Sequence, residues 1–270
     1  MIMEIIGIAT YAMDVMMVVD ALPAEDGFAT VKKVTLLPGG SGTNVLVQAA
    51  RLGAHCRFMG KVGDDRIGDG VVASLRAEGI DTAGVRVKKG GVSLSTTIVV
   101  DEKGRKFILL NMGDAFPAFG PAEIDRRLFA PGCIYYSDLL PCAAAREGFR
   151  LARGAGMKTA FNLQAGLETM AGLGVTREIL LDTLRDVDLF APCREGLYAL
   201  CGTQDPTRCL AFLRPYFAGS LVLTMGGEGA VAFDPQDRLF RCPARPVKVV
   251  DTTGAGDSFM GALLVASQVE

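Results

Sequence analysis

Near the end of the chain, a carboxylate stands at the start of an expected helix, directly after two glycines. Residues 249–250 form a β-branched run, Asp251-Thr252-Thr253-Gly254-Ala255-Gly256-Asp257 follows, and apolar residues then recur at helical spacing from Phe259 to Leu264. We predict a strand, a turn and a helix here, with Gly254 to Asp257 at the helix N-terminus.

Such a helix start suits an anion. The first N–H groups of a helix lack partners within it, the helix dipole places partial positive charge there, and glycines let an anion approach the backbone. A carboxylate beside a phosphate site is a natural base for a hydroxyl group that attacks phosphorus, so Asp257 is the candidate base. A plain helix cap is the alternative for Asp257. The sequence contains no G-x-x-x-x-G-K-[ST] phosphate loop.

A second glycine-rich helix start lies early in the chain, at Pro38-Gly39-Gly40-Ser41-Gly42-Thr43-Asn44. Glycines here would let a ligand lie against the backbone, and the Asn44 amide offers a donor and an acceptor to a polyol hydroxyl. By itself, the same pattern also fits an ordinary turn and cap.

The rest of the chain alternates between strands and helices, which predicts an α/β fold. Strands are expected at 4–9, 57–62, 133–137, 158–162, 187–191 and 221–224, and helices at 45–52, 71–78, 143–153, 177–184, 194–200 and 206–216. Right-handed crossovers between such units build a doubly wound, mostly parallel sheet flanked by helices. Ligands bind at the carboxyl ends of its strands, where Asn162, Thr224 and Gly226 fall.

Two segments interrupt this alternation with short strands. Residues 85–111 contain strand-like runs joined by a hairpin turn at 101–104, and residues 14–37 contain two more. We expect these segments to form a small antiparallel sheet within a single domain of residues 1–270. It could be a lid over a site, a dimer surface, or both.

Composition restricts the function. The chain has 270 residues and a net charge of −2, which offers no electrostatic basis for binding nucleic acid or an anionic membrane. Seven cysteines without a C-x-x-C pair, together with one histidine, disfavour a zinc site and suit a reducing cytosol. We find no signal peptide and no membrane-spanning apolar run, and we therefore expect a cytoplasmic protein.

The two glycine-rich motifs, in this order, resemble the two signatures of the ribokinase-like (PfkB) carbohydrate kinases. Three further stretches resemble motifs of that family and occur in the family's order. They are Asp14 ahead of Leu22-Pro23, Gly63-Asp64-Asp65 with Gly68, and Leu223-Thr224-Met225-Gly226 with Gly229. The resemblance covers nearly the whole chain and implies a ribokinase-like fold whose small β sheet is a lid that also forms a homodimer.

The resemblance also implies roles for single residues. Asp257 matches the catalytic base, and the family's anion hole corresponds to Gly254, Ala255 and Gly256. The positions that bind the substrate hydroxyls correspond to Asp14, Gly40 and Asn44, and the nucleotide site to Thr224, Gly226 and Gly229. The monovalent-cation site corresponds to Asp251 and Thr253. The implied partners are a small-molecule sugar and ATP, with Mg²⁺ and possible K⁺ as cofactors.

Three features depart from the family pattern. Cys193 and Gly196 stand where the family carries Asn and Glu of an Asn-x-x-Glu motif that orders Mg²⁺ and phosphate, and Glu195 is the substitute that we assign to Mg²⁺. The chain also stops soon after the Asp257 helix, so we expect either a truncated chain or a reduced member. Ser41 replaces a lysine of several members, which disfavours a phosphorylated substrate.

Together these features favour an ATP-dependent kinase that phosphorylates a hydroxyl group of a neutral sugar or polyol. Two alternatives stay open: a sugar-binding or regulatory protein with little turnover, and a nucleoside or vitamin kinase of the same superfamily. The sequence does not name the acceptor.

Overall fold

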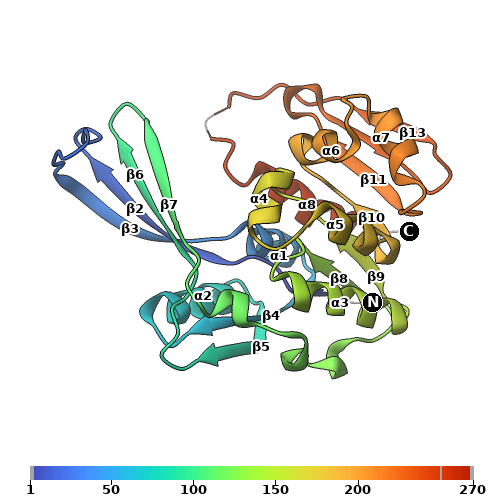
Figure 1. The fold of residues 1–270 in the computed structure, drawn as a ribbon, viewed down its shortest axis with the longest axis horizontal. Coiled ribbons are helices and arrows are strands. Elements are labelled where there is room, and N and C mark those ends of the chain that lie inside the picture. Colours follow the sequence, from blue (N-terminus) through green and yellow to red (C-terminus); the bar gives the residue numbers. More distant parts are fainter. Residues whose placement is uncertain (1–2, 250, 268–270) are drawn as a thin grey trace.

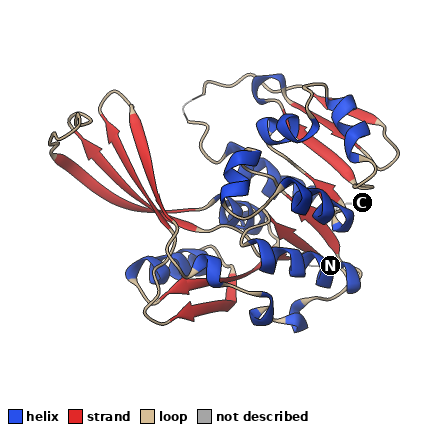
Figure 2. Cartoon of the chain, viewed as in Figure 1, coloured by secondary structure: helices blue, strands red, loops and turns tan. Residues whose placement is uncertain are grey.

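The computed structural model of the chain describes residues 3–249 and 251–267 and contains one large and one small sheet (Figures 1 and 2). The nine strands of the large sheet run in the order β13-β12-β11-β10-β9-β8-β1-β4-β5, and only β12 and β13 are antiparallel to their neighbours. Their bounds are β1 Glu4–Gly7, β4 His55–Gly63, β5 Asp81–Lys88, β8 Cys133–Ser137, β9 Lys158–Phe161, β10 Leu189–Phe190, β11 Ser220–Thr224, β12 Ala230–Phe233 and β13 Leu239–Cys242.

Helices flank this sheet, as the alternation predicted (Figure 2). They are α1 Ser41–Arg51, α2 Arg66–Ala77, α3 Cys142–Gly154, α4 Leu167–Gly172, α5 Arg177–Thr183, α6 Arg194–Cys201, α7 Pro206–Leu213 and α8 Ala255–Ala266, with 3₁₀ turns at Phe116–Ala118, Pro121–Glu123, Arg126–Leu128, Leu184–Asp186 and Gly226–Glu228. None of the helices in the described ranges has the length and apolar character that crossing a membrane requires.

A row of buried aromatic rings crosses the core beneath the parallel strands. Tyr135 contacts Phe149 at 4.9 Å between ring centroids, Phe161 stacks on Phe190 at 5.1 Å, and Phe217 meets Phe190 edge-on at 5.9 Å. These contacts join α3 to strands β8, β9 and β10 and fix the strand ends at which ligands bind.

The small sheet has the order β3-β2-β6-β7, with bounds β2 Ala12–Val19, β3 Val31–Gly39, β6 Ser95–Asp101 and β7 Lys106–Asn111. It projects away from the body of the molecule, at the left of Figure 1. Its two hairpins are antiparallel, but β2 and β6 pair in parallel, from Met13–Ser95 to Val19–Asp101.

One part of the small sheet was predicted wrongly. Val85 and Val87 belong to β5 of the large sheet, where they pair with Gly60 and Val62 of β4. The physical reason is the intervening helix α2, because a strand that follows a crossover helix returns parallel to the strand before it. The small sheet therefore takes residues 12–39 and 95–111 and leaves residues 85–88 to the large one.

The strand expected at residues 249–250 is not formed at Val249, and Val250 lies outside the described residues. Residues 243–249 are irregular, and Val247 and Val249 are 75% and 66% exposed. A β-branched run becomes a strand only where a neighbour pairs with it, and the sheet ends one strand earlier, at β13.

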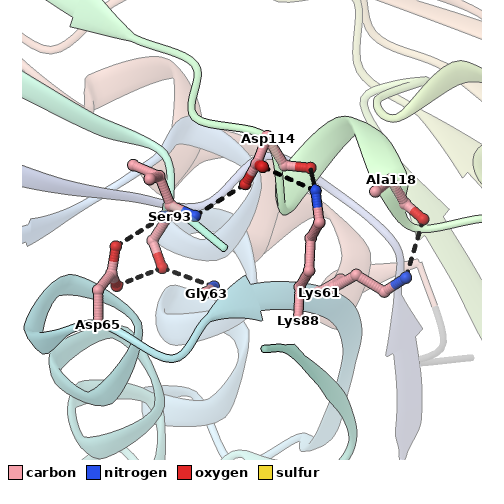
Figure 3. A network of polar contacts seen from close by, with 8 residues as sticks. Lys61, Gly63, Asp65, Lys88, Ser93, Asp114 and Ala118 are labelled. Carbon is pink, nitrogen blue, oxygen red and sulfur yellow. Dashed lines mark hydrogen bonds and ion pairs between the residues drawn. The ribbon is translucent and has the colours of Figure 1, made fainter. Parts of the chain in front are cut away.

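A polar network fixes the root of the small sheet (Figure 3). The Asp65 carboxylate caps α2 by accepting a hydrogen bond from Gly68 N at 2.7 Å, and it also accepts from Ser93 N at 2.8 Å and Ser93 Oγ at 2.7 Å. The Ser93 hydroxyl in turn accepts from Gly63 N at 2.8 Å. The network thus connects the end of β4, the start of α2 and the segment leading into β6.

The return segment after β7 is tied down in the same region (Figure 3). Asp114 accepts hydrogen bonds from Val92 N and from Lys88 Nζ, both at 2.8 Å, and Lys61 Nζ donates to Ala118 O at 3.0 Å. The segment that leads from β5 into β6 and the segment that returns after β7 are therefore both anchored to β4 and β5.

Candidate active site

Helix α8 begins at the predicted glycine corner. Its N-cap, Gly254, has a φ of 73°, in the left-handed region that glycine adopts without strain. Asp251 Oδ1 accepts a hydrogen bond from Thr253 N at 2.8 Å, which shapes the turn ahead of the helix. Ala255 N donates to Thr252 O at 3.1 Å, so the N–H groups that follow it, at Gly256 and Asp257, are the donors that an anion would use.

Helix α8 packs against α1, which brings the two glycine-rich motifs together. The helices approach closely at Gly261, where a Cβ would lie only 2.6 Å from Val45 O. This packing lets Asn44 Nδ2 donate a hydrogen bond to Asp257 Oδ2 at 2.9 Å, across 213 positions of sequence.

The environment of Asp257 suits a base. The side chain is half-buried, and this burial raises the pKa of its carboxyl above the usual value, while the hydrogen bond from Asn44 lowers it. Burial has the larger effect, so the carboxylate holds a proton more tightly than an exposed aspartate does.

Helix α1 starts in a position that only glycine can occupy. Gly40, its N-cap, has a φ of 90°, and a Cβ there would lie 2.4 Å from backbone atoms of Tyr11 and Ala12. Thr43 N donates to Thr10 O at 2.9 Å, so the first turn of the helix lies directly on the segment that joins β1 to β2.

Asp14 lies at the root of the small sheet, next to this turn. It pairs with Leu37 of β3 and Thr96 of β6, and Thr96 Oγ1 donates a hydrogen bond to Asp14 Oδ1. A Cβ on Gly39 would collide with the Asp14 carboxylate. Asp14 therefore lies beside Gly39, the residue before Gly40.

A cavity of about 150 Å³, which we call the Asp257 cavity, lies at the carboxyl ends of the parallel strands. Its lining comes from the ends of three strands, β9, β10 and β11, and from the starts of α1 and α8. The lining residues are Ser41, Asn162, Gln164, Ala191, Pro192, Cys193, Val222, Thr224, Gly256, Asp257, Phe259 and Met260.

A larger cavity of about 690 Å³, which we call the Gly229 cavity, lies on the other side of the α8 start. Thr224, Gly226 and Gly229, the three residues predicted to bind nucleotide, all line it, and so does Ala255 of the predicted anion hole. Most of the remaining wall is apolar. Both cavities are lined by Val222, Thr224, Gly256 and Phe259, so the two meet between β11 and the N-terminus of α8.

Other predicted residues lie apart from these walls. Asp251 and Thr253, assigned to a monovalent cation, are exposed and contact each other. Glu195, assigned to Mg²⁺, is exposed on α6 and does not line the Asp257 cavity. The described residues contain no group of three or more His, Cys, Asp or Glu side chains placed to hold a metal ion.

Sequence reasoning missed Gln164 as a site residue. It lines the Asp257 cavity, and its Nε2 donates a hydrogen bond to the Tyr136 hydroxyl at 3.3 Å. A signal was present, because Gln164 follows Asn162 by two positions beyond the end of the same strand, where ligand-binding residues gather.

This combination of a doubly wound sheet, a cavity at its carboxyl edge beside a helix N-terminus, and an attached small sheet defines a ribokinase-like α/β protein. Residues 3–267 match the model of the pfkB family carbohydrate kinases. The chain belongs to this family.

Curated relatives agree with this assignment. The chain is 30% identical over 243 residues to a bifunctional ribokinase/ribose-5-phosphate isomerase A of Fructilactobacillus sanfranciscensis, covering 86% of this chain and 42% of that protein. It is 26% identical over 259 residues to a probable fructokinase-2 of Arabidopsis thaliana, covering 92% of this chain and 78% of the relative.

Solved structures share the fold. A ribokinase from Thermotoga maritima superposes with a TM-score of 0.81 at 21% identity, covering 99% of this chain and 86% of that one. A ribokinase-type structure from E. coli in complex with ATP and Mg²⁺ gives 0.82 at 20% identity, with the same coverage.

Proposed function

We propose that the protein transfers the γ-phosphoryl group of ATP to a hydroxyl group of a small neutral sugar or polyol, with Asp257 as the base. The observation that carries this proposal is the meeting of the two cavities at the start of α8. A phosphate chain that entered from the Gly229 cavity would reach the free N–H groups of α8, with Asp257 on the far side.

The step that follows from this placement is an in-line displacement. The Asp257 carboxylate accepts the proton of the acceptor hydroxyl as the oxygen attacks phosphorus, and Asn44 holds the carboxylate in position. We assign the charge that develops on the phosphoryl oxygens to the backbone at Gly254, Ala255 and Gly256, although Ala255 N donates to Thr252 O at 3.1 Å in this structure. ADP leaves through the Gly229 cavity.

ATP and Mg²⁺ are the cofactors that we propose, by analogy with the E. coli structure of the same fold. Asn162, Gln164, Thr224 and Asp257 line the Asp257 cavity, and their side chains carry oxygen atoms, which suit a hard cation, whereas the Cys193 thiol does not. When bound, Mg²⁺ neutralises charge on the phosphates. We assign K⁺ to Asp251 and Thr253 as a proposal that rests on the sequence motif alone.

A neutral acceptor is the substrate class that the site supports. The described residues that line the Asp257 cavity include no lysine or arginine, so nothing there would neutralise a phosphate on the acceptor. Asp14 and Asn44, the side chains assigned to the acceptor, do not line this cavity, although Asn44 contacts Asp257; they offer a carboxylate and an amide, which bind hydroxyl groups through hydrogen bonds.

We also propose that the small sheet closes over the acceptor and pairs two copies of the chain, within the cytoplasm. Apolar side chains exposed on β3 and β7 support the pairing. All seven cysteines are free thiols, which suits a reducing compartment.

The test is ATP-dependent phosphorylation of a panel of neutral sugars, sugar phosphates and nucleosides, with Mg²⁺ and K⁺ present. We expect turnover on a neutral sugar or polyol, and we expect Asp257→Asn to lower kcat by about 10²–10⁴-fold, the usual contribution of a positioned base. Asp69→Asn, the same change at an exposed site on α2, is the control. Wild-type turnover in Asp257→Asn, or turnover restricted to sugar phosphates or nucleosides, would refute the proposal.

A further inference from the structure

The N-terminus of α6 borders the Asp257 cavity but offers Mg²⁺ no suitable side chain. Mg²⁺ takes oxygen ligands and keeps several water molecules, which protein oxygens then hold. Cys193, the N-cap of α6, uses its Sγ to accept a hydrogen bond from Gly196 N at 3.3 Å. Sulfur is a soft atom and a poor partner for a hard cation.

Gly196 cannot be exchanged for a residue that carries a carboxylate. A Cβ at this position would lie 2.9 Å from Ala165 O, 2.9 Å from Leu163 Cδ2 and 3.1 Å from Cys193 Sγ. Two of these contacts come from the segment that follows β9, which lies against the start of α6 and is joined to it by a hydrogen bond from Cys193 N to Leu163 O. A side chain at position 196 would therefore collide with the backbone oxygen of Ala165 and with the side chains of Leu163 and Cys193.

Glu195 does not fill this gap either. It is exposed and does not line the Asp257 cavity. Its Oε1 lies close to Gly166, since a Cβ on that glycine would be only 2.8 Å from it. Its carboxylate therefore lies beside the start of α4 rather than in the cavity wall.

The segment that closes the space at Gly196 brings two amides to the cavity instead. Asn162 and Gln164 both line the Asp257 cavity, and Asn162 is 9% exposed. Gln164 is held in place by the hydrogen bond from its Nε2 to the hydroxyl of Tyr136, which is fully buried. This bond uses one of the two Nε2 hydrogens and fixes the amide, whose oxygen is the atom that can accept from a ligand or from a metal-bound water.

We propose that Gln164 and Asn162 hold the hydrated Mg²⁺ of the ATP phosphates in the Asp257 cavity, a task that Cys193 and Gly196 cannot perform in this chain. Tyr136 is a positioning residue for Gln164. This inference rests on the proposed kinase function and assigns its metal-linked contacts to the segment after β9.

The test measures metal binding without turnover. Mn²⁺ replaces Mg²⁺, the β,γ-imido analogue of ATP replaces the substrate, and electron paramagnetic resonance counts free Mn²⁺ with and without the protein. We expect Gln164→Ala and Asn162→Ala each to weaken Mn²⁺ binding to the protein–analogue complex by about tenfold or more, as loss of an outer-shell partner does. Gln204→Ala, at an exposed glutamine, and Glu195→Gln should bind Mn²⁺ as the wild type does.

Two further variants distinguish the loss of a metal contact from damage to the fold. Gln164→Glu adds negative charge at the same place and should tighten Mn²⁺ binding, a gain that structural damage would not produce. Tyr136→Phe keeps the buried ring, releases the Gln164 amide and should weaken Mn²⁺ binding less than Gln164→Ala does.

The outcomes separate this proposal from the function on which it rests. Unchanged Mn²⁺ binding in both amide variants, or weakened binding in Glu195→Gln, overturns the metal assignment while kinase activity stands. A wild-type protein that shows no analogue-dependent Mn²⁺ binding overturns both.

Discussion

At the scale of single residues, two opposing effects set the proton affinity of Asp257: burial raises the pKa of its carboxyl and the Asn44 hydrogen bond lowers it. A base must be deprotonated, so kcat/KM should fall at low pH, and the fall should lie above the ordinary titration range of an aspartate. Asn44→Leu removes the hydrogen bond that lowers the pKa of Asp257, so the fall of kcat/KM at low pH should move to still higher pH. The pH profile of kcat/KM for the two proteins checks the prediction, and a limb that moved to lower pH would contradict it.

Asp138 is a second buried carboxyl, and it affects stability. Burial raises its pKa from 3.8 to about 6, while hydrogen bonds from Thr10 N at 2.9 Å and Leu140 N at 3.2 Å oppose the rise. A raised pKa in the folded state stabilises the fold below the unfolded value, and this contribution is lost as the pH rises through about 6.

The Asp138 contribution corresponds to about 3 kcal/mol, since one pKa unit is about 1.4 kcal/mol. Urea unfolding from pH 4 to pH 7 should therefore show the free energy of unfolding of the wild type falling relative to that of Asp138→Asn, which has no proton to lose. Parallel pH dependences of the two proteins would show that Asp138 keeps its ordinary pKa.

The sequence indicated Asp257 and Asn44 because each lies in a glycine-rich motif, and the structure joins them directly. It could not indicate the pairing of Gln164 with Tyr136. That contact depends on the register of two strands, in which Tyr136 of β8 lies beside Ala160 of β9, and no local pattern specifies register.

At the scale of elements, the start of α1 depends on the absence of a side chain at Gly40. Gly40→Ala combines a strained φ of 90° with a collision against Tyr11 and Ala12. We expect it to lower the free energy of unfolding by about 2–5 kcal/mol, the sum of typical strain and overpacking costs.

Gly53→Ala is a matched control for this prediction. Gly53 has a φ of 95°, but a Cβ there would meet nothing within 4 Å, so the variant should show the strain alone, about 1–2 kcal/mol. Urea unfolding measures both variants, and equal losses would show that Gly40 has more space than its neighbours suggest.

The root of the small sheet depends on the buried Ser93 hydroxyl, which accepts a hydrogen bond from Gly63 N and donates to Asp65. Ser93→Ala leaves Gly63 N without its partner, and we expect a loss of about 1–3 kcal/mol in the free energy of unfolding. Ser74→Ala, a half-buried serine of α2 whose hydroxyl donates only within its own helix, to Val71 O, leaves no buried donor unpaired and should cost less. A loss in Ser93→Ala no larger than in this control would show that the network contributes little.

The sequence predicted most elements well, and its two errors share a cause. Val85 and Val87 were given to the small sheet, and residues 249–250 to a strand, because a β-branched run favours extended backbone. Whether such a run joins a sheet, and which one, depends on distant strands: β4 pairs with the first run, whereas the sheet ends at β13 before Val249.

At the scale of the whole molecule, the small sheet carries exposed apolar side chains on both outer strands. Leu36 on β3 is 61% exposed and Leu109 on β7 is 58% exposed. Apolar side chains gathered on an exposed surface mark an interface, so we expect two copies of the chain to pair through this sheet.

Analytical ultracentrifugation tests the pairing. The wild type should sediment as a dimer, and Leu109→Glu should shift it towards monomer, because a buried unpaired carboxylate opposes association. Leu239→Glu, on the exposed strand β13 of the large sheet, should leave the dimer intact. A monomeric wild type, or an undisturbed dimer in Leu109→Glu, would exclude this interface.

The order of the large sheet also bears on how the chain folds as it is made. β1 is synthesised first but lies between β8 and β4, and from β8 onwards each new strand joins the edge left by the one before it, up to β13. A chain leaving the ribosome can therefore add these strands one at a time without opening a pair already formed, and each pairing is local in sequence. Until Cys133–Ser137 has emerged, however, one side of β1 stays unpaired, which makes this the stage of synthesis at which the nascent chain most needs protection from aggregation.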